Sequence, residues 1–424
     1  MIALGLLRTS YFLTDSWFVG KLGDSALEAI GGAAFAWWMI HICCDLAGTG
    51  AHSLVARQEG AGTRDRIAST LMQGLWVSLV VTLGLLALVP ARGTYFDMLG
   101  YAAGGEAWVL GGEYVRVCLL GAGTLAVYAV VGAAFRALGQ TRTALALTAV
   151  TLVVNLVLDP ALIWGWGPLP ALGIGGAAWA TAVANGTGAI AGLALLWRRG
   201  IRIVPEAPAW SVTTTIGRIG LPVTVAGLGF SFVYVLLGRI ISDFGGHNMA
   251  ALGIGHRLES LAYMITVGFS VGAGTMAGQH LGAGSKELAD ACVKAASRLC
   301  IACMLPCSIL LAIGAPWFFD LFTDDPAIIA SGVVYLRCQA VVFVAMGVEV
   351  VYQGGFTGAG HTMPGLVIGG TLNTARIPMA WALGALAGLG IVGVWVAIAI
   401  STGVKAVATW WWWRRGTWAK LELG

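Results

Sequence analysis

One apolar stretch of the chain carries polar residues at regular intervals. Residues three or four positions apart share one face of an α-helix, and this spacing joins Thr148, Thr151, Asn155 and Asp159. A carboxylate inside a membrane is costly unless it has a partner or a water-filled cavity. This face is therefore a candidate site for binding a cation or a proton.

A second carboxylate, Asp15, lies in the first apolar stretch, with Tyr11 one turn before it. Another apolar stretch adds Thr181 and Asn185, again one turn apart. Two carboxylates close together in a low dielectric do not both ionise easily, so we expect at least one to bind a proton near neutral pH. The structural alternative is that Asp15 and Asp159 cap or cross-link helices.

A further polar stripe runs along the stretch from residue 29 to residue 56. It consists of His41, Asp45, Thr49 and Ser53 at successive i+4 positions, with His52 alongside. A histidine beside an aspartate can relay protons or recognise cationic solutes. It can equally be a hydrogen-bonded pair that only locks helices together, and the sequence leaves both interpretations open.

The elements that carry these residues must be membrane-spanning helices. Of all residues, 58% are hydrophobic and only 10% are charged, whereas soluble chains carry about 25% charged residues. Apolar stretches long enough to cross about 30 Å of hydrocarbon recur about twelve times. The predicted spans are Met1–Gly20, Ala29–Ala56, Ile67–Pro90, Glu106–Phe135, Ala144–Trp164, Leu172–Trp197, Thr213–Asp243, Met249–Gly278, Ala289–Phe319, Ile328–Thr357, Pro364–Ala387 and Leu389–Trp413.

Basic residues fall in alternate loops between these spans. They cluster around Arg64, Arg136, Arg199 and Lys286 and in the tail at Arg414. Because cytoplasmic loops hold the excess of Lys and Arg, we expect both termini to face the cytoplasm. Little sequence is left for a soluble catalytic or nucleic-acid-binding domain.

The chain contains an internal repeat. Seven residues of the first half, from Gly23 to Gly62, match residues from Gly245 to Gly284 at one constant offset. Further matching pairs are Tyr114 with Tyr335, Arg116 with Arg337, Phe135 with Phe356, Gly139 with Gly360 and Thr141 with Thr362. A duplicated unit of six helices gives two parallel pseudo-symmetric bundles around a central cleft. We expect an N-terminal lobe over 1–197, a cytoplasmic linker over 198–211 and a C-terminal lobe over 212–424.

The repeat also shows that one acidic position is not required by the fold. At the same constant offset, the partner of Asp15 is Leu237. This asymmetry suggests a task given to one lobe.

All eight cysteines lie inside apolar spans, so a disulfide framework is not expected. Cys300, Cys303 and Cys307 have helical spacing, but no His or acid stands beside them, which favours packing over metal binding. We expect no metal site, no catalytic residues and no cofactor other than a coupling ion.

Five segments are informative when taken together: residues 15–23 with Ala29 and Gly31, and residues 136–141, 155–160, 173–181 and 257–263. Together they resemble the multidrug and toxic compound extrusion (MATE) transporters, in particular their DinF-like branch. The resemblance implies twelve helices in two lobes and antiport of organic, often cationic, compounds against protons or sodium. It also implies an ion site formed by Asp15, Asn155, Asp159 and Thr181.

Two further points follow from the resemblance. The other bacterial branch uses an acidic residue early in the seventh span, where this chain has Leu228, Gly229 and Phe230, which favours coupling in the first lobe. Family members also carry further residues, including a proline, before the position at which this sequence begins. Either the true start lies upstream or the first helix is short on its cytoplasmic side, and the sequence leaves both open.

The leading prediction is thus a secondary antiporter in a plasma membrane that exports amphipathic organic compounds. Its substrate pocket would be lined by Tyr11, His41, Asp45 and Asn185. The alternative is a lipid-linked precursor flippase, whose cleft needs several basic residues, and only Arg8, Arg239 and Arg376 are candidates. An enzyme or a channel is disfavoured because no nucleophile with a base and no pore sequence is present. The expected partners are small organic molecules and the bilayer, with no nucleic acid, and the expected state is a monomer.

Overall fold

Residues 17–421 are described in a computed structural model of the chain. In this range the chain forms helices joined by short connections, without any strand. It divides into two compact units, with the division inside one long helix between Thr224 and Val225. We call residues 17–224 the first unit and residues 225–421 the second unit.

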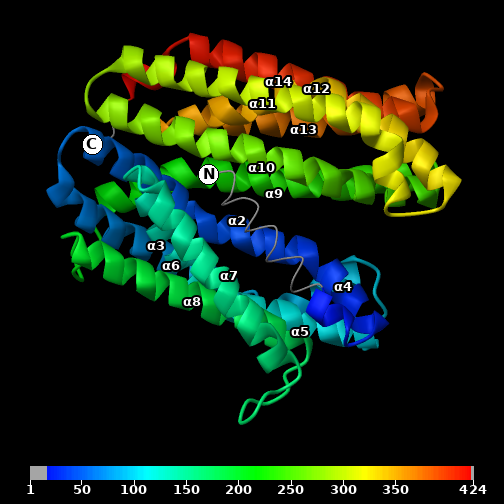
Figure 1. Cartoon of the computed structure of the whole chain (residues 1–424), viewed down its shortest axis with the longest axis horizontal. Helices are drawn as coiled ribbons and strands as arrows, with labels where there is room; N and C mark the ends of the chain where they lie inside the picture. The colour runs from blue at the N-terminus through cyan, green and yellow to red at the C-terminus, as the bar shows by residue number, and fades with distance from the viewer. Residues whose placement is uncertain (1–16, 422–424) are drawn as a thin grey trace. The chain divides into compact units, whose positions relative to one another are not determined.

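The first unit contains helices α2 to α8 and the short helical turns between them (Figure 1). They are α2 (Asp24–Gly60), η1 (Arg64–Arg66), α3 (Ile67–Leu86), η2 (Val89–Ala91), α4 (Arg92–Met98), α5 (Glu106–Leu120), α6 (Ala122–Ala137), α7 (Thr141–Ile163) and α8 (Ile174–Arg198). The next helix, α9 (Trp210–Asp243), begins in this unit and ends in the second.

The second unit contains the remaining helices, which follow α9. Its further helices are α10 (Gly246–Gly282), α11 (Lys286–Asp320), α12 (Pro326–Gly358), α13 (Met363–Trp381), the π-helical turn η3 (Ala382–Leu386), α14 (Gly390–Arg414) and η4 (Thr417–Lys420).

Most of the described helices are suited to crossing a membrane. Nine of them are long and apolar enough to do so, and α5 with α6 forms a tenth, bent span. Helix α13 and the π-helical turn η3 together cover the predicted span Pro364–Ala387 up to Leu386. The predicted span Met1–Gly20 lies outside the described residues except for its last four. The predicted all-helical, multi-pass membrane fold is confirmed.

The predicted continuous span from Glu106 to Phe135 is instead bent by 48°. The break lies at Gly121, where a Cβ atom would approach the Cβ of Ala182 on α8 to 2.6 Å. The Thr124 hydroxyl donates to the carbonyl oxygens of Gly121 and Ala182, each at 2.9 Å. The bend therefore follows from close packing of α5 and α6 on α8.

The internal repeat appears as equivalent contacts in the two units. A buried phenylalanine packs onto a glycine of the following helix in each: Phe96 onto Gly111 and Phe319 onto Gly332. Any side chain at these two glycines would overlap the ring. The duplication is therefore kept in the packing as well as in the sequence.

A second pair of equivalent contacts closes each unit. Gly176 at the start of α8 lies against the backbone of Leu162 in α7, and Gly393 at the start of α14 lies against the backbone of Leu383. Backbone cannot move aside as a flexible side chain can. These glycines therefore set the depth at which the last helix of each unit packs on its predecessor, as small residues do in membrane helix contacts.

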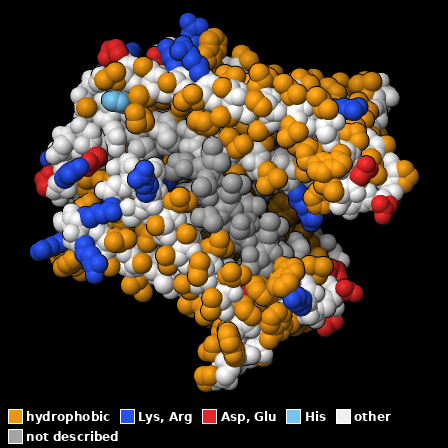
Figure 2. All heavy atoms as spheres, in the orientation of Figure 1, with side chains coloured by type: hydrophobic (Ala, Val, Ile, Leu, Met, Phe, Trp, Pro, Cys, Tyr) orange, Lys and Arg blue, Asp and Glu red, His pale blue; other side chains and the backbone are white. Residues whose placement is uncertain are grey.

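The outer surface of each unit suits a lipid environment. Figure 2 shows hydrophobic side chains over the sides of both units, and large exposed ones include Val80, Ile190, Ile313 and Val341. In the first unit, Arg64, Arg66, Arg142, Arg198 and Arg199 are exposed and lie in or beside the connections that follow α2, α6 and α8, while Lys21 and Arg116 are exposed elsewhere. This distribution agrees with charged loops flanking an apolar, membrane-embedded band.

The glycine contacts give a first prediction about stability. Gly176→Ala and Gly393→Ala force a Cβ atom into backbone and should each destabilise the protein by about 1–3 kcal/mol. Gly84→Ala and Gly370→Ala meet nothing within 4 Å and should be neutral or stabilising by about 0.5–1 kcal/mol, because alanine favours helix. Thermal unfolding of detergent-solubilised protein checks this, and equal melting temperatures for both pairs would contradict it.

Candidate functional site

Helix α7 turns its polar face toward the interior of the first unit. Asn155 and Asp159 are 0% exposed, and Thr148 and Thr151 are also buried. The opposite face exposes Val153, Leu156 and Val157, as expected of a helix that meets lipid on one side. The helix thus places an aspartate inside a membrane-embedded bundle.

Asn155 connects α7 to α8. Its Nδ2 donates to Asp159 Oδ1 at 3.0 Å and to Thr181 Oγ1 at 3.3 Å. The two residues on α7 are one turn apart, and the Gly176 contact holds α8 close enough for Thr181 to join them. The structure therefore brings together three of the four residues predicted for the ion site.

The cluster offers oxygen atoms to a small cation. Asn155 uses its NH₂ group as a donor, while its Oδ1 is buried and has no hydrogen-bond partner among the described residues. This oxygen, the Asp159 carboxylate and Thr181 Oγ1 are hard ligands of the kind that bind small cations. Burying the carboxylate charge favours the binding of a proton or a cation that neutralises it.

The remaining residues of the stripe have local roles. The Thr148 hydroxyl lies 2.9 Å from the Tyr128 hydroxyl, and the Thr151 hydroxyl donates to the Thr148 carbonyl oxygen at 2.9 Å. Asn185 is buried on α8 one turn after Thr181. Asp15, predicted for the ion site, and Tyr11, predicted to line the substrate pocket, lie outside the described residues.

The second predicted stripe lies on α2. His41 Nδ1 is 3.6 Å from Asp45 Oδ2, with side-chain exposures of 14% and 34%. The centroid of the His41 ring lies 5.3 Å from that of Trp37 and 6.2 Å from that of Trp38. A partly exposed carboxylate on a helix face that also carries aromatic rings can contact an organic cation.

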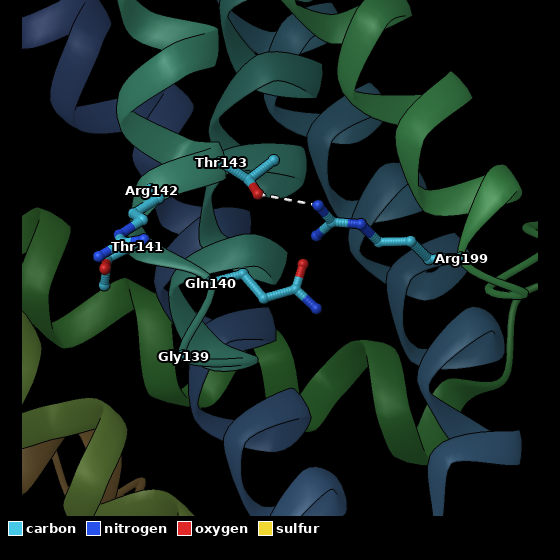
Figure 3. Close-up of a pocket in the computed structure, with 6 residues that line it drawn as sticks. All are labelled: Gly139, Gln140, Thr141, Arg142, Thr143 and Arg199. Carbon is cyan, nitrogen blue, oxygen red and sulfur yellow. Dashed lines mark hydrogen bonds between the residues drawn. The ribbon is translucent and has the colours of Figure 1, made fainter.

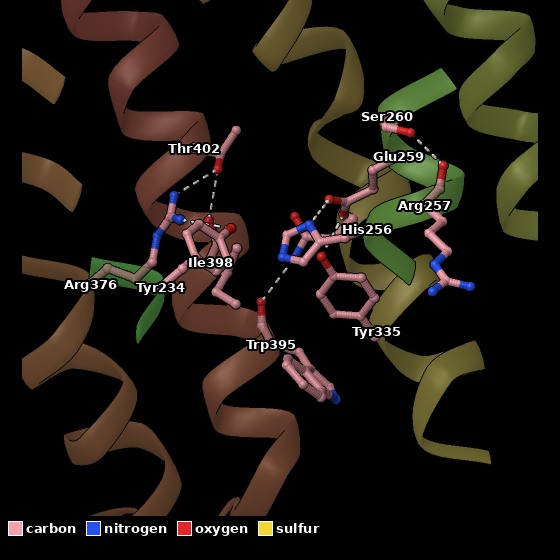
Figure 4. Close-up of polar contacts among 11 residues, drawn as sticks. Tyr234, His256, Arg257, Glu259, Ser260, Tyr335, Arg376, Trp395, Ile398 and Thr402 are labelled. Carbon is pink, nitrogen blue, oxygen red and sulfur yellow. Dashed lines mark hydrogen bonds and ion pairs between the residues drawn. The ribbon is translucent and has the colours of Figure 1, made fainter. Parts of the chain in front are cut away.

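The second unit contains a polar cluster that the sequence indicated only in part (Figure 4). Glu259 Oε1 accepts a hydrogen bond from the Tyr335 hydroxyl at 2.7 Å, and Glu259 Oε2 lies 3.0 Å from His256 Nδ1. Arg257 of the same helix is exposed, and its side chain points away from this cluster. Glu259 is therefore held by a histidine and a tyrosine instead of an arginine.

Arg376 of α13 lies in the same cluster and is 1% exposed. Its guanidinium donates to Ser401 Oγ at 2.8 Å, to the Tyr234 hydroxyl at 3.0 Å and to Thr402 Oγ1 at 3.4 Å. A buried cation needs hydrogen-bond acceptors to replace water. The hydroxyl groups of α9 and α14 supply them and so hold Arg376 of α13 against these two helices.

A buried ion pair joins α12 and α14. Lys405 Nζ lies 3.2 Å from Glu349 Oε1, and both side chains are less than a tenth exposed. Gln353 Nε2 also donates to Glu349 Oε1, at 3.0 Å. Sequence reasoning missed this pair, although a lone acid and a lone lysine inside two apolar spans were the available signal.

Two other features carry less functional weight. A shallow hollow at the end of the first unit is lined by residues 139–143 and Arg199, whose Nη2 donates to Thr143 Oγ1 at 3.0 Å (Figure 3). Within residues 17–421, no group of three or more His, Cys, Asp or Glu is placed to hold a metal ion. Cys300 is buried whereas Cys303 is exposed, so these two thiols face different surroundings.

Comparison with known proteins agrees with this architecture. The family model MatE matches residues 1–161 and 222–382, two ranges of equal length that correspond to the two repeats. The Probable multidrug resistance protein NorM of Thermotoga maritima is 26% identical over 98% of this chain and 90% of its own length. The FAD transporter of Shewanella oneidensis is 25% identical over 96% of this chain and 90% of its own length.

The fold also matches solved structures. A MOP superfamily transporter from Pyrococcus furiosus, described as having a binding pocket of reversed polarity, aligns with a TM-score of 0.90. That match covers 99% of this chain and 95% of the other at 24% identity. The chain belongs to the MatE family of multidrug efflux transporters.

The buried ion pair gives a second prediction. Lys405→Met leaves Glu349 without its cation, which should destabilise the protein by about 3–5 kcal/mol. The double variant Lys405→Met with Glu349→Gln should recover most of this loss, because neither buried charge then remains. Thermal unfolding of the two single variants and the double variant checks this. Additive losses in the double variant would show that the two side chains do not interact.

Proposed function

We propose that this transporter is a secondary antiporter that exports amphipathic, often cationic, organic compounds in exchange for protons or sodium. Membership of an efflux family supports the export of small molecules, and the relatives' names include multidrug resistance proteins. The coupling ion and the substrate class are our inference from the chemistry of the two polar stripes.

The observation that carries the proposal is the buried cluster of Asn155, Asp159 and Thr181. Together with Asp15, these residues form the proposed ion site. The cluster sits at a contact between two helices, so an ion bound there changes the forces that hold α7 to α8. We also propose that the chain belongs to the DinF-like branch, since the corresponding part of α9 has Leu228, Gly229 and Phe230 in place of an acid.

An ion drives transport only if it binds one conformation better than the other. Shifting a population from 1:99 to 99:1 requires about 5.5 kcal/mol of such preference. An uncompensated charge in a membrane interior costs about 2.5 kcal/mol or more, so neutralising a buried carboxylate supplies a large part of this preference. Protonation or sodium binding at Asp159 is therefore strong enough to bias α7 and α8 toward one arrangement.

The proposed substrate surface involves His41 and Asp45 together with Asn185 and Tyr11. The two tryptophans beside His41 offer flat apolar faces, and the Asp45 carboxylate offers a negative charge. This combination suits a planar organic cation, by cation–π attraction as well as charge. We further propose a plasma membrane location with both termini in the cytoplasm, on the basis of the alternating basic loops.

The central test is transport in proteoliposomes. Efflux of a fluorescent cationic dye is measured under an imposed proton gradient and, separately, an imposed sodium gradient. Wild-type protein should move dye with one of these gradients. Asp15→Asn and Asp159→Asn should each abolish gradient-driven movement, because an amide cannot exchange a proton and binds a cation weakly.

The outcome that overturns the proposal is equally clear. If neither gradient moves dye, or if both variants transport as well as wild type, the first unit is not the coupling site. The flippase alternative then gains support and is tested with a lipid-linked pyrophosphate in the same liposomes.

A finer test uses two threonines of α8. Thr181→Val removes the hydroxyl that Asn155 contacts and should weaken the affinity for the coupling ion about tenfold, which corresponds to about 1.4 kcal/mol. The matched control is Thr187→Val, since the Thr187 hydroxyl only contacts the Val183 carbonyl oxygen of its own helix. The ion concentration for half-maximal efflux distinguishes them, and equal values would remove Thr181 from the site.

A further inference from the structure

Arg376 occupies in the second unit the place that Asn155 occupies in the first. The preceding turns contain the equivalent glycines Gly139 and Gly360, with left-handed φ angles of 71° and 73°. At the other end, the last helix of each unit contacts equivalent backbone positions, as the paired glycine contacts show. No residue is inserted or lost between these points, so Asn155 corresponds to Arg376 and, one turn later, Asp159 corresponds to Ala380.

The surroundings of the two positions also correspond. Asn155 is 0% exposed and contacts Thr181 on α8, the last helix of the first unit. Arg376 is 1% exposed and contacts Ser401 and Thr402 on α14, the last helix of the second unit. Each position is therefore a buried junction between the last two long helices of its unit, made through hydroxyl groups.

The charge at the two junctions is opposite. The first unit places the Asp159 carboxylate there, whereas the second unit has the apolar Ala380 and a guanidinium. Arginine does not lose its proton in proteins, so the second junction holds a positive charge under all physiological conditions. Another cation cannot bind beside it without strong repulsion.

The guanidinium is held by neutral groups. Within residues 17–421, no Asp or Glu oxygen forms an ion pair with Arg376. Its guanidinium donates to hydroxyl groups and lies 5.5 Å from the centre of the Tyr234 ring. Titratable side chains among the polar groups around it include Tyr234 on α9, His256 and Glu259 on α10, Tyr335 and Glu349 on α12 and Lys405 on α14. The two acids in this set are held by other partners, Glu259 by His256 and Tyr335, and Glu349 by Lys405 and Gln353.

We propose that Arg376 is a built-in cation that fills the second unit's counterpart of the ion site. The coupling ion then binds only in the first unit, and the second unit behaves permanently as if its ion were bound. This inference rests on the proposed ion site at Asp159 and adds the reason why one of the two repeated units responds to the ion. Because Arg376 is sealed from solvent in this conformation, its role is to position α13 and α14 rather than to contact substrate.

Transplanting the first site into the second unit tests the proposal. Arg376→Asn with Ala380→Asp recreates the Asn155–Asp159 pair on α13. Binding of radioactive sodium, or of protons followed with a pH indicator, is measured in detergent for four proteins: wild type, Asp159→Asn, the transplant, and the transplant combined with Asp159→Asn. We expect Asp159→Asn to lose ion binding and the combined variant to regain it.

The four proteins separate two kinds of failure. If Asp159→Asn binds the ion as wild type does, the proposed ion site in the first unit is wrong. If Asp159→Asn loses binding while a folded combined variant fails to regain it, the first-unit site stands and the inference about Arg376 is wrong. Thermal unfolding of each protein establishes which variants are folded.

A second pair of variants decides the matter if the transplant does not fold. Arg376→Lys keeps the charge, and its efflux should keep the wild-type dependence on the coupling ion. Arg376→Gln keeps hydrogen-bonding capacity without charge, and efflux should need about a tenfold higher ion concentration, because the second unit then loses the fixed charge that holds it in the ion-bound arrangement. The inference fails if the glutamine variant keeps the wild-type ion dependence, or if the lysine variant is as impaired as the glutamine variant.

Discussion

A polar or charged side chain inside a membrane bundle must find its partners among the helices of that bundle, since neither lipid nor bulk water supplies them. Both units of this transporter meet this constraint at the junction of their last two long helices. The first unit surrounds the Asp159 carboxylate with an amide and a hydroxyl. The second unit surrounds the Arg376 guanidinium with three hydroxyls. The position of the polar residue is shared, and its charge is not.

What the repeats share is mainly packing. The Phe96–Gly111 and Phe319–Gly332 contacts, like the glycine contacts of α8 and α14, depend on the absence of a side chain and tolerate little change. The polar residues between these contacts are free to diverge, because any group that fits and finds hydrogen bonds satisfies the fold. A duplicated membrane protein can in this way keep one architecture while its two halves acquire different chemistry.

Much of this arrangement could be predicted from the sequence. Hydropathy predicted the spans, and the periodicity of Thr148 to Asp159 predicted a buried polar face, because helical spacing alone decides which residues share a face. The Lys405–Glu349 pair was missed although each residue is a lone charge in an apolar span, and the contacts of Arg376 could not be predicted, since they join helices that are distant in sequence. The bend at Gly121 was also missed, because a glycine in a long apolar stretch rarely signals a break. The predicted residues Asp15 and Tyr11 lie outside the described range.

The bend between α5 and α6 links the candidate site to a more distant part of the first unit. Ala182, whose carbonyl oxygen accepts a hydrogen bond from Thr124, directly follows Thr181 in α8. A displacement of α8 at Thr181 therefore moves this carbonyl oxygen as well. The Thr124 hydroxyl must then follow it, changing the angle of the bend, or lose one of its two acceptors. The bent span is thus hydrogen-bonded to α8 one residue away from Thr181, the proposed ion ligand, so its bend angle and the ion site are mechanically coupled.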